Sequence, residues 1–262
     1  NPRSPRVRAV AKLAKRSARE ETGLFLVEGP QAVAEALQFQ AGLVVDLFIT
    51  PAALDRYAEI ARAAAASGID VETVSDHVLD TMADTVTPQG VIAVARQFPV
   101  TVKELLSGGA KLVVILEEVR DPGNAGTIIR AADAAGADGV ILTGKSVDAY
   151  NPKVVRSTTG SLFHVSVSQG GELDAAIKAA KRAGMQVLAA DIAGDDLPMM
   201  RERLAQPTAW LFGHEAHGLT DESLKLADAV VKVPIYGHAE SLNLATAASV
   251  CLYESAFAQR AG

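Results

Sequence analysis

The strongest constraint on the fold is the alternation of short apolar strands and helices in the second half of the 262-residue chain. Residues 112–116 are continuously apolar, which is typical of a parallel strand that is covered on both faces. Residues 125–135 then place apolar side chains at helical spacing, and residues 174–183 repeat this pattern before Gly184 ends the helix. The alternation continues to the C-terminus, with strands expected at 140–142, 163–167, 186–190, 209–212 and 230–233 and helices at 154–159, 221–226 and 242–259. It predicts an α/β fold with an open, mostly parallel sheet and helices on both faces.

The first half of the chain is predicted to form a separate, small α/β domain. Its strands are expected at 24–27, 44–49, 69–74 and 90–95, and its helices at 31–39, 54–66 and 76–82. Pro99 and the Ser107-Gly108-Gly109 sequence interrupt the pattern between the two halves. We therefore predict an N-terminal domain over residues 1–98, a linker over residues 99–109 and a second domain over residues 110–262.

The composition restricts the class of protein. Apolar residues make up 49% and charged residues 21% of the chain, which excludes a disordered protein. No apolar run reaches the roughly 18 residues that a membrane span needs, and the N-terminus lacks the apolar segment of a secretory signal. Cys251 is the only cysteine, so no intramolecular disulfide can form. We therefore expect a cytoplasmic protein with no membrane partner.

The net charge of −6 is distributed unevenly. The first nineteen residues carry seven basic side chains and no acid, so the remaining chain has a net charge of −13. Four of the seven recur at helical spacing and predict a basic stripe. Such a stripe is either a solvated arm or a surface that binds the phosphates of a nucleic acid. The candidate RNA-binding residues are Arg3, Arg6, Arg8, Lys12, Lys15, Arg16 and Arg19.

The first of three notable loops, Asp121-Pro-Gly-Asn-Ala-Gly126, follows the 112–116 strand and leads into a helix that carries Arg130. Its glycines allow a close backbone approach, and the helix N-terminus can receive an anion. The loop lacks the third glycine of a dinucleotide-binding loop, and Thr143-Gly-Lys145 follows the next strand in place of the expected acid. These details disfavour a nucleotide-dependent oxidoreductase. They leave Arg130 as either a surface residue or a functional one.

The second loop, within Leu211–Leu219, holds Glu215 between two histidines. His214 and His217 are three residues apart between glycines, whereas the zinc-binding H-E-x-x-H helix places its histidines four apart. No further cluster of cysteine or histidine completes a site, so we predict no bound metal. Glu215 is either a solvated acid or a hydrogen-bond acceptor at the carboxyl edge of the sheet.

The third loop presents Ser241 and Asn243 at the start of the last helix. Either residue can cap a helix, but one cap needs only one such side chain. A second polar residue is what a polar ligand at a helix N-terminus would also require. Ser241 lacks the G-x-S-x-G sequence of a nucleophile elbow, and His238 makes only a weak case for a catalytic triad.

Together, and in this order, the three loops resemble the three motifs of the SpoU/TrmH family of RNA ribose 2′-O-methyltransferases. The matching segments are Asn124-x-Gly126-x-x-x-Arg130, Leu211-x-Gly213-x-Glu215-x-x-Gly218-Leu219 and Ser241-Leu-Asn243. The resemblance is strong over residues 112–254. It is weaker in the first half, where Asn1-Pro2, the basic arm, Phe25–Gly29 and Gln89–Val91 resemble the family's RNA substrate-binding domain, which itself resembles a small ribosomal protein.

The resemblance implies properties that composition does not show. The C-terminal domain would carry a deep trefoil knot that holds S-adenosylmethionine, largely through backbone groups and with no metal. The cofactor-binding positions would be Ala190, Gly213, Val233, Ile235, Leu242 and Leu244. The protein would be a homodimer with its active site beside the interface. Its substrate would be RNA, with 23S ribosomal RNA favoured over tRNA.

The resemblance also implies which polar residues surround the reaction, namely Asn124, Arg130, Glu215, Ser241 and Asn243. Ser241 and Asn243 would hold the ribose 2′-hydroxyl and Arg130, while Glu215 would orient Arg130 or Asn124. Arginine is a costly general base because its pKa exceeds about 12. We therefore prefer Arg130 as a clamp on a neighbouring phosphate and as a stabiliser of the developing alkoxide.

Two alternatives also bind RNA, but they differ in the substrate or in the activity. One is a tRNA 2′-O-methyltransferase, and the other is a non-catalytic RNA-binding or ribosome-assembly protein on the same fold. The presence of all five polar residues disfavours the non-catalytic protein. Housekeeping modification and antibiotic resistance both fit the sequence pattern.

Overall fold

The computed structural model describes residues 1–261, which divide into two compact units. The first unit contains residues 1–98 together with residues 150–164. The second contains residues 99–149 and the rest of the described chain from residue 165. The chain therefore passes between the units three times, and nothing in the sequence pattern indicates that residues 150–164 pack with the first unit.

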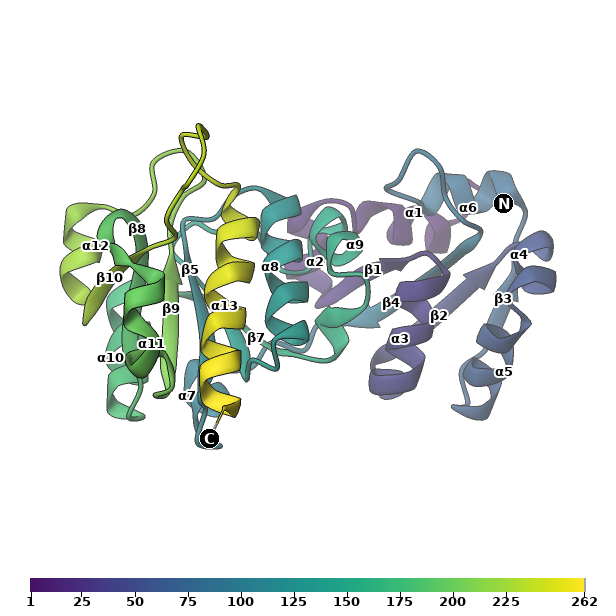
Figure 1. Cartoon of the computed structure of the whole chain (residues 1–262). Helices are drawn as coiled ribbons and strands as arrows, with labels where there is room; N and C mark the ends of the chain where they lie inside the picture. Colours follow the sequence, from purple (N-terminus) through teal and green to yellow (C-terminus); the bar gives the residue numbers. More distant parts are fainter. Residues whose placement is uncertain (262) are drawn as a thin grey trace. The chain divides into compact units, whose positions relative to one another are not determined.

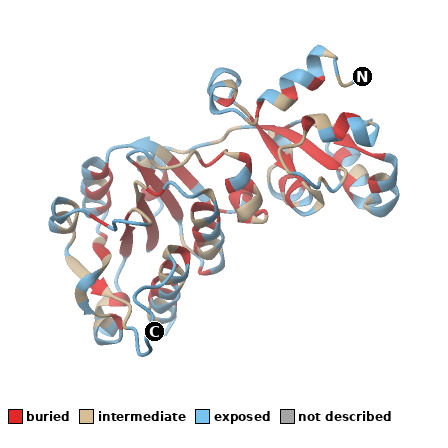
Figure 2. Ribbon diagram, turned by 90° about the horizontal axis from the view of Figure 1, so that it is seen from above, coloured by how far each residue is buried: buried red, intermediate tan, exposed pale blue. Residues whose placement is uncertain are grey.

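The second unit is built on a parallel sheet, as predicted. Its six strands lie in the order β10-β8-β9-β5-β6-β7, and each neighbouring pair is parallel (Figure 1). The strands are β5 (Leu112–Glu117), β6 (Gly139–Thr143), β7 (Ser166–Gly171), β8 (Gln186–Asp196), β9 (Thr208–Phe212) and β10 (Ala229–Lys232). The central strands β5, β6 and β9 are almost fully buried, which explains their continuous apolar runs, since helices cover both faces (Figure 2).

Helices pack on the two faces of this sheet. On one face, α7 (Val102–Leu106) and α10 (Leu173–Arg182) share an apolar core with alternate residues of the strands, among them Val113, Ile115 and Leu211. On the other face, α8 (Pro122–Ala134) and α13 (Leu244–Arg260) lie side by side (Figure 1). Two shorter helices complete the unit, α11 (Arg201–Leu204) and α12 (Asp221–Leu226). The α7 helix lies in the stretch predicted as a linker, and Leu105 and Leu106 pack in the core.

A buried tryptophan fixes α13 against the sheet. Trp210 on β9 is fully buried, and its indole N–H donates a hydrogen bond of 2.9 Å to the Ser255 hydroxyl on α13. The next residue on the same face of β9, Phe212, stacks on Trp210 with 6.2 Å between the ring centroids. Because the indole nitrogen is satisfied, this large side chain stabilises the core without an unpaired polar atom.

The strand order reverses between β5 and β9. From β5 the chain builds β6 and β7 towards one edge, and it then crosses to add β8, β9 and β10 on the other side. Ligands of open α/β sheets bind beyond the carboxyl ends of the strands at such a reversal. This topology places the site of the second unit at the loops that follow β5 and β9.

The first unit has a mixed sheet of four strands in the order β1-β4-β2-β3. The strands are β1 (Leu24–Glu28), β2 (Val44–Ile49), β3 (Val71–Thr73) and β4 (Val91–Arg96). Both contacts of β4 are antiparallel, and only β2 and β3 are parallel. The helices are α1 (Pro5–Lys12), α2 (Arg16–Thr22), α3 (Pro30–Gln40), α4 (Pro51–Arg56), α5 (Ala58–Ala66), α6 (Asp76–Met82) and α9 (Pro152–Thr158). The single helix predicted at 54–66 is two helices, because the backbone of Tyr57 leaves the helical conformation.

Residues 150–164 complete the core of the first unit. Tyr150 packs on Phe25 with 4.8 Å between ring centroids, and its hydroxyl accepts a hydrogen bond from the Phe98 N–H. Phe163 stacks on Phe98 at 6.0 Å. On α9, Arg156 donates to the buried Glu28 carboxylate at 2.6 Å and also pairs with Asp84 at 3.0 Å. The segment thus contributes both apolar packing and the partner of a buried charge.

Two further features concern membrane-spanning helices and the single cysteine. Among the helices that the structure describes, none combines the length and apolar character needed to cross a bilayer. Cys251 lies buried in α13, and burial raises the pKa of its thiol to about 12. The thiol is therefore protonated at neutral pH and plays a packing role.

Arg156→Met is expected to destabilise the protein, because it leaves the Glu28 carboxylate buried without its charged partner. Arg156 is itself 29% exposed, so we expect a loss of about 2 kcal/mol in the free energy of unfolding, below the range for a fully buried pair. Chemical denaturation monitored by circular dichroism measures this loss. Lys153→Met on the same helix is the control, since Lys153 is exposed, and equal stability of the two variants would contradict the assignment.

Candidate active site

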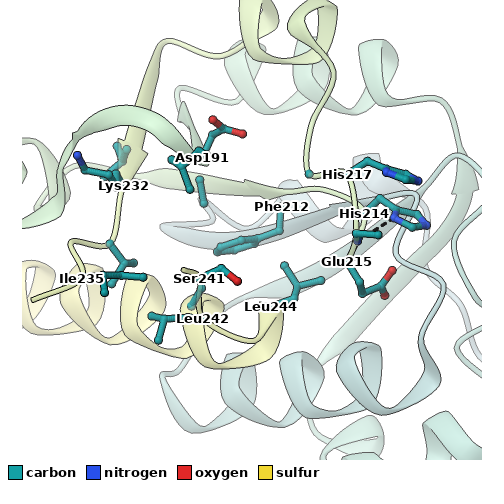
Figure 3. A pocket seen from close by; sticks show the side chains of 17 residues that line it. Asp191, Phe212, His214, Glu215, His217, Lys232, Ile235, Ser241, Leu242 and Leu244 are labelled. Carbon is teal, nitrogen blue, oxygen red and sulfur yellow. Dashed lines mark hydrogen bonds between the residues drawn. The ribbon is translucent and has the colours of Figure 1, made fainter. Parts of the chain in front are cut away.

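A cavity of about 340 Å³ opens beside an irregular stretch of β8 and the carboxyl ends of β9 and β10 (Figure 3). Its volume lies within the range of small-molecule sites. Apolar side chains form most of the wall, and the polar groups are few. The lining residues are Ala190, Asp191, Ile192, Phe212, His214, Glu215, Ala216, His217, Gly218, Val231, Lys232, Val233, Ile235, Ser241, Leu242, Leu244 and Ala247.

One wall of the cavity is a large bulge in β8. The neighbouring residues Val230 and Val231 of β10 pair with Ala189 and Asp195, so five residues of β8 lie outside the ladder. The first three of these, residues 190–192, line the cavity. The chain rejoins the ladder at Asp195, directly after Gly194, where a Cβ atom would stand 2.5 Å from the backbone of Val230. Bulges of this kind redirect side chains beside functional sites.

A second wall depends on the close approach of two glycines after β9. His214 and Gly218 bond to each other through both backbone groups, which folds residues 214–218 into a tight turn. A Cβ atom on Gly213 would stand 2.5 Å from the Gly218 carbonyl, so only glycine fits there. This turn presents the backbone of the second motif to the cavity.

The third wall is the segment that leads from β10 to α13. Val233, Ile235, Ser241, Leu242 and Leu244 all line the cavity from this segment. Helix α13 is capped by Asn243, whose side-chain oxygen accepts the Thr246 N–H at 3.2 Å. The cap is therefore Asn243, which leaves the Ser241 hydroxyl for another partner.

Glu215 joins the loops that follow β9 and β5. Its carboxylate accepts the Asp121 N–H at 2.8 Å and the Arg120 N–H at 3.3 Å. These amides lie just before α8, where backbone donors have no partner within the helix. The expected bonds from Glu215 to Arg130 or Asn124 are absent among the described residues; its two carboxylate oxygens bind these backbone donors instead.

The network continues to the last helix. The Asp121 carboxylate caps α8 by accepting the Asn124 N–H at 2.7 Å. The side-chain oxygen of Asn124 then accepts a hydrogen bond of 3.0 Å from the Asn243 side-chain amide. Glu215, Asp121, Asn124 and Asn243 therefore connect the three loops that the sequence singled out.

The loop between β5 and α8 contains a strained residue. Glu118 has a positive φ of 57°, which is unfavourable for a residue with a side chain. Its carboxylate is held by the Lys145 N–H at 2.9 Å and the Arg120 guanidinium at 2.8 Å, and these bonds lower the pKa of Glu118. Burial instead raises the pKa of the adjacent Glu117, against the effect of its hydrogen bond with Thr143. Several bonds thus hold this loop in one conformation.

The structure brings four of the five predicted reaction residues into this arrangement. Glu215 and Ser241 line the cavity, and Asn124 and Asn243 bond to each other beside it. Arg130 is exposed on α8, and its guanidinium forms no hydrogen bond or ion pair with the other residues described, 1–261. Its guanidinium is therefore available to a ligand.

Five of the six predicted cofactor positions line the cavity, namely Ala190, Val233, Ile235, Leu242 and Leu244. The sixth, Gly213, does not line the cavity, but it allows the close approach to Gly218 in the turn after β9. The motif analysis did not identify Asp191, Lys232 or Phe212 as lining residues. Asp191 could have been identified from the sequence, because it is an acid directly after the predicted strand 186–190.

The basic N-terminal residues are not equivalent. Arg19 is 2% exposed and donates to the Leu13 and Ala14 carbonyls, so it cannot contribute to an exposed stripe. Helix α1 ends at Lys12, which interrupts the predicted helical spacing. Arg6 pairs with Asp46 and Glu72 and lies over the Phe48 ring at 5.1 Å. Arg6 is exposed, and so are the other five, of which Arg16 pairs with Glu20; these five are Arg3, Arg8, Lys12, Lys15 and Arg16.

The part of the chain that the structure describes contains no cluster of three or more potential metal ligands. The stacked rings of His214 and His217, 4.7 Å apart, lie at the cavity with Glu215. The Nδ1 atom of His214 accepts the Ala216 N–H, and both oxygens of Glu215 bind backbone amides.

Comparison with known proteins assigns both units. Residues 111–253 match the model of the SpoU rRNA methylase family, which covers more than half of the chain. The chain belongs to this family. Residues 4–93 match the MRM3-like substrate binding domain.

Similar proteins with assigned names and similar proteins with solved structures both align over nearly the whole of this chain. A 23S rRNA (guanosine(2553)-2′-O)-methyltransferase of Bacillus subtilis is 32% identical over 96% of this chain and 96% of its own. The AdoMet-bound rRNA methyltransferase of Sinorhizobium meliloti superposes with a TM-score of 0.82 and 32% identity, covering 96% of this chain and 94% of that one. The AdoMet complex of the SpoU methyltransferase AviRb from Streptomyces viridochromogenes superposes with a TM-score of 0.84 and 30% identity, covering 99% of this chain and 100% of that one.

Gly213→Ala is expected to disrupt the turn after β9, because the added methyl group would overlap the Gly218 carbonyl. Overpacking against backbone costs about 2 kcal/mol of the free energy of unfolding. Gly171→Ala is the control, since no atom lies within 4 Å of its Cβ position, and it should change stability by less than about 0.5 kcal/mol. Denaturant titrations that gave the same midpoint for Gly213→Ala and the wild type would refute the close approach.

Proposed function

We propose that this protein transfers a methyl group from S-adenosylmethionine to a ribose 2′-hydroxyl of 23S ribosomal RNA. The observation that supports this function is the hydrogen-bonded network of Glu215, Asp121, Asn124 and Asn243 at the edge of one cavity. It joins the three motifs of a methyltransferase family to which the chain belongs. The names of the similar proteins favour ribosomal RNA over tRNA.

The cavity fits S-adenosylmethionine by its size and by the chemistry of its wall. Phe212, Val231 and Leu244 offer apolar surface to the adenine ring, and the glycines at 194 and 213 let backbone groups approach closely. We propose that Ala190, Gly213, Val233, Ile235, Leu242 and Leu244 form the cofactor pocket. When bound, the cofactor supplies a methyl group on a positively charged sulfur, so no metal is required.

The residues of the chain position the acceptor ribose. Asn243 uses its oxygen for the cap of α13 and its amide for the Asn124 oxygen, so the amide N–H groups of Asn124 can donate to a ligand. Ser241 adds a hydroxyl that can accept a hydrogen bond from the ribose 2′-OH. These two groups fix the direction of attack, which accounts for much of the rate enhancement of an oriented transfer.

Arg130 and Glu215 have different roles. Arg130 is free to bind a phosphate of the RNA and to stabilise the negative charge that develops on the 2′-oxygen, whose proton passes to solvent water as the methyl group is transferred. Glu215 binds two backbone amides, so it acts as a positioning residue for the loop before α8 rather than as the base. This role replaces the direct contact with Arg130 or Asn124 that the motif resemblance implies.

The first unit is proposed to bind the RNA. Its match to a substrate-binding domain and its exposed basic residues within 3–16 support this role. We also propose that the protein is a homodimer, because α13 exposes the apolar side chains of Val250, Tyr253 and Phe257. The trefoil knot and the cytoplasmic location stay predictions.

Arg130→Ala is expected to reduce methyl transfer by about 100-fold, because it removes a group that stabilises developing charge. Transfer of labelled methyl groups to RNA transcribed without modification measures the rate. Calorimetry with S-adenosylhomocysteine should give unchanged affinity, since Arg130 does not line the cavity. Arg182→Ala, on an exposed position of α10, is the matched control. Near-normal turnover of Arg130→Ala would exclude Arg130 from the reaction.

Arg8→Ala combined with Lys12→Ala is expected to weaken RNA binding and to reduce its salt dependence. Loss of two phosphate contacts should lower the slope of log affinity against log salt by about 2. Filter binding at several salt concentrations measures the slope. Arg62→Ala, exposed on α5, is the control, and an unchanged slope in the double variant would place the RNA elsewhere.

Maps of 2′-O-methylation in total RNA, with and without the gene, identify the substrate. A methylated position in 23S rRNA that depends on the gene supports the proposal. A dependent position in tRNA corrects the substrate, and no dependent position favours the non-catalytic alternative.

A further inference from the structure

We infer that Asp191 binds the α-ammonium group of S-adenosylmethionine and so recognises the amino-acid end of the cofactor. This inference rests on the proposed function and assigns a role to a residue outside the three motifs. It depends on where the β8 bulge places Asp191 and on which acids of the cavity are free.

The bulge brings Asp191 into the cavity wall. Ala189 is the last residue that pairs before the five-residue excursion, and Gly194 allows the chain to return close to the backbone of Val230. Within the bulge, Oδ1 of Asp191 accepts the Ala193 N–H at 2.9 Å, which fixes the side chain. In the view of Figure 3, Asp191 lies apart from Ser241, with Phe212 between them.

One oxygen of Asp191 remains available to a ligand. Its Oδ2 atom lies 3.6 Å from the position that a Cβ atom of Gly218 would occupy, and it accepts no hydrogen bond from the described residues. Each oxygen of Glu215 already accepts one backbone amide. Among the acids that line the cavity, Asp191 is therefore the one with an oxygen that accepts no hydrogen bond from the described residues.

The lysine in the wall is already paired. Lys232, on the neighbouring strand, forms an ion pair of 3.2 Å with Asp196. Asp191 therefore contributes an uncompensated negative charge to a mainly apolar cavity. Such a charge favours a cationic ligand with N–H donors, since charge-assisted hydrogen bonds are stronger than those to neutral hydroxyls.

The α-ammonium is the part of S-adenosylmethionine that meets both conditions. The sulfonium carries a positive charge but no hydrogen-bond donor, and the ribose hydroxyls donate but carry no charge. Adenine instead suits the apolar wall formed by Phe212 and Leu244. The chemistry of the cavity thus assigns Asp191 to the amino-acid end.

Calorimetry with two stable compounds tests this assignment. S-adenosylhomocysteine retains the ammonium group, whereas 5′-methylthioadenosine lacks the amino-acid end but keeps adenine and ribose. In the full chain, Asp191→Asn should weaken S-adenosylhomocysteine by about tenfold and change 5′-methylthioadenosine by less than about twofold. The asparagine oxygen can still accept the Ala193 N–H, so the bulge is retained.

Asp195→Asn is the matched control, because Asp195 is exposed in the same strand and does not line the cavity. It should leave both affinities within about twofold. An equal loss for the two compounds in Asp191→Asn would overturn the assignment in favour of a ribose contact. Unchanged affinities in Asp191→Asn would overturn it as well. Failure of the wild-type chain to bind either compound would overturn the proposed function together with the assignment.

Discussion

The site depends on the carboxylate of Glu215, which binds two backbone amides across the point where the strand order reverses. The loop after β5 would otherwise leave two backbone donors, the amides of Arg120 and Asp121, without this partner. The connection of this loop to the loop after β9 fixes the start of α8, so Asn124 meets Asn243 from the last helix. The geometry of the cavity wall and of the acceptor residues is therefore set by the same few bonds.

Much of the second unit was predictable because its physical signals are local. The continuous apolar runs required a sheet with two covered faces, and the strands form such a sheet. The three motifs marked loops that the structure joins in one place. The partners of Glu215 were not predictable, since backbone amides carry no sequence signal. The bulge in β8 was also missed, because its key residue, Gly194, acts only through its distance from another strand.

The first unit shows how tertiary packing overrides a pattern of spacing. Arg19 fits a basic helical stripe by its position in the sequence, yet its guanidinium is buried against the carbonyls of Leu13 and Ala14. The break between α1 and α2 creates these acceptors. The count of charges identified the basic segment but did not show that Arg19 is a structural residue. It also did not show that Arg6 is paired with two acidic residues.

The position of residues 150–164 restricts how proteins of this architecture can exchange their N-terminal parts. A fragment that ends at Phe98 would lack Tyr150 and Phe163, and it would leave Glu28 without Arg156. Recombination at a single point after Phe98 would therefore leave the core of the first unit with residues 150–164 from a different protein. A successful chimera must transfer residues 150–164 together with the N-terminal unit, so the two must change together as sequences diverge.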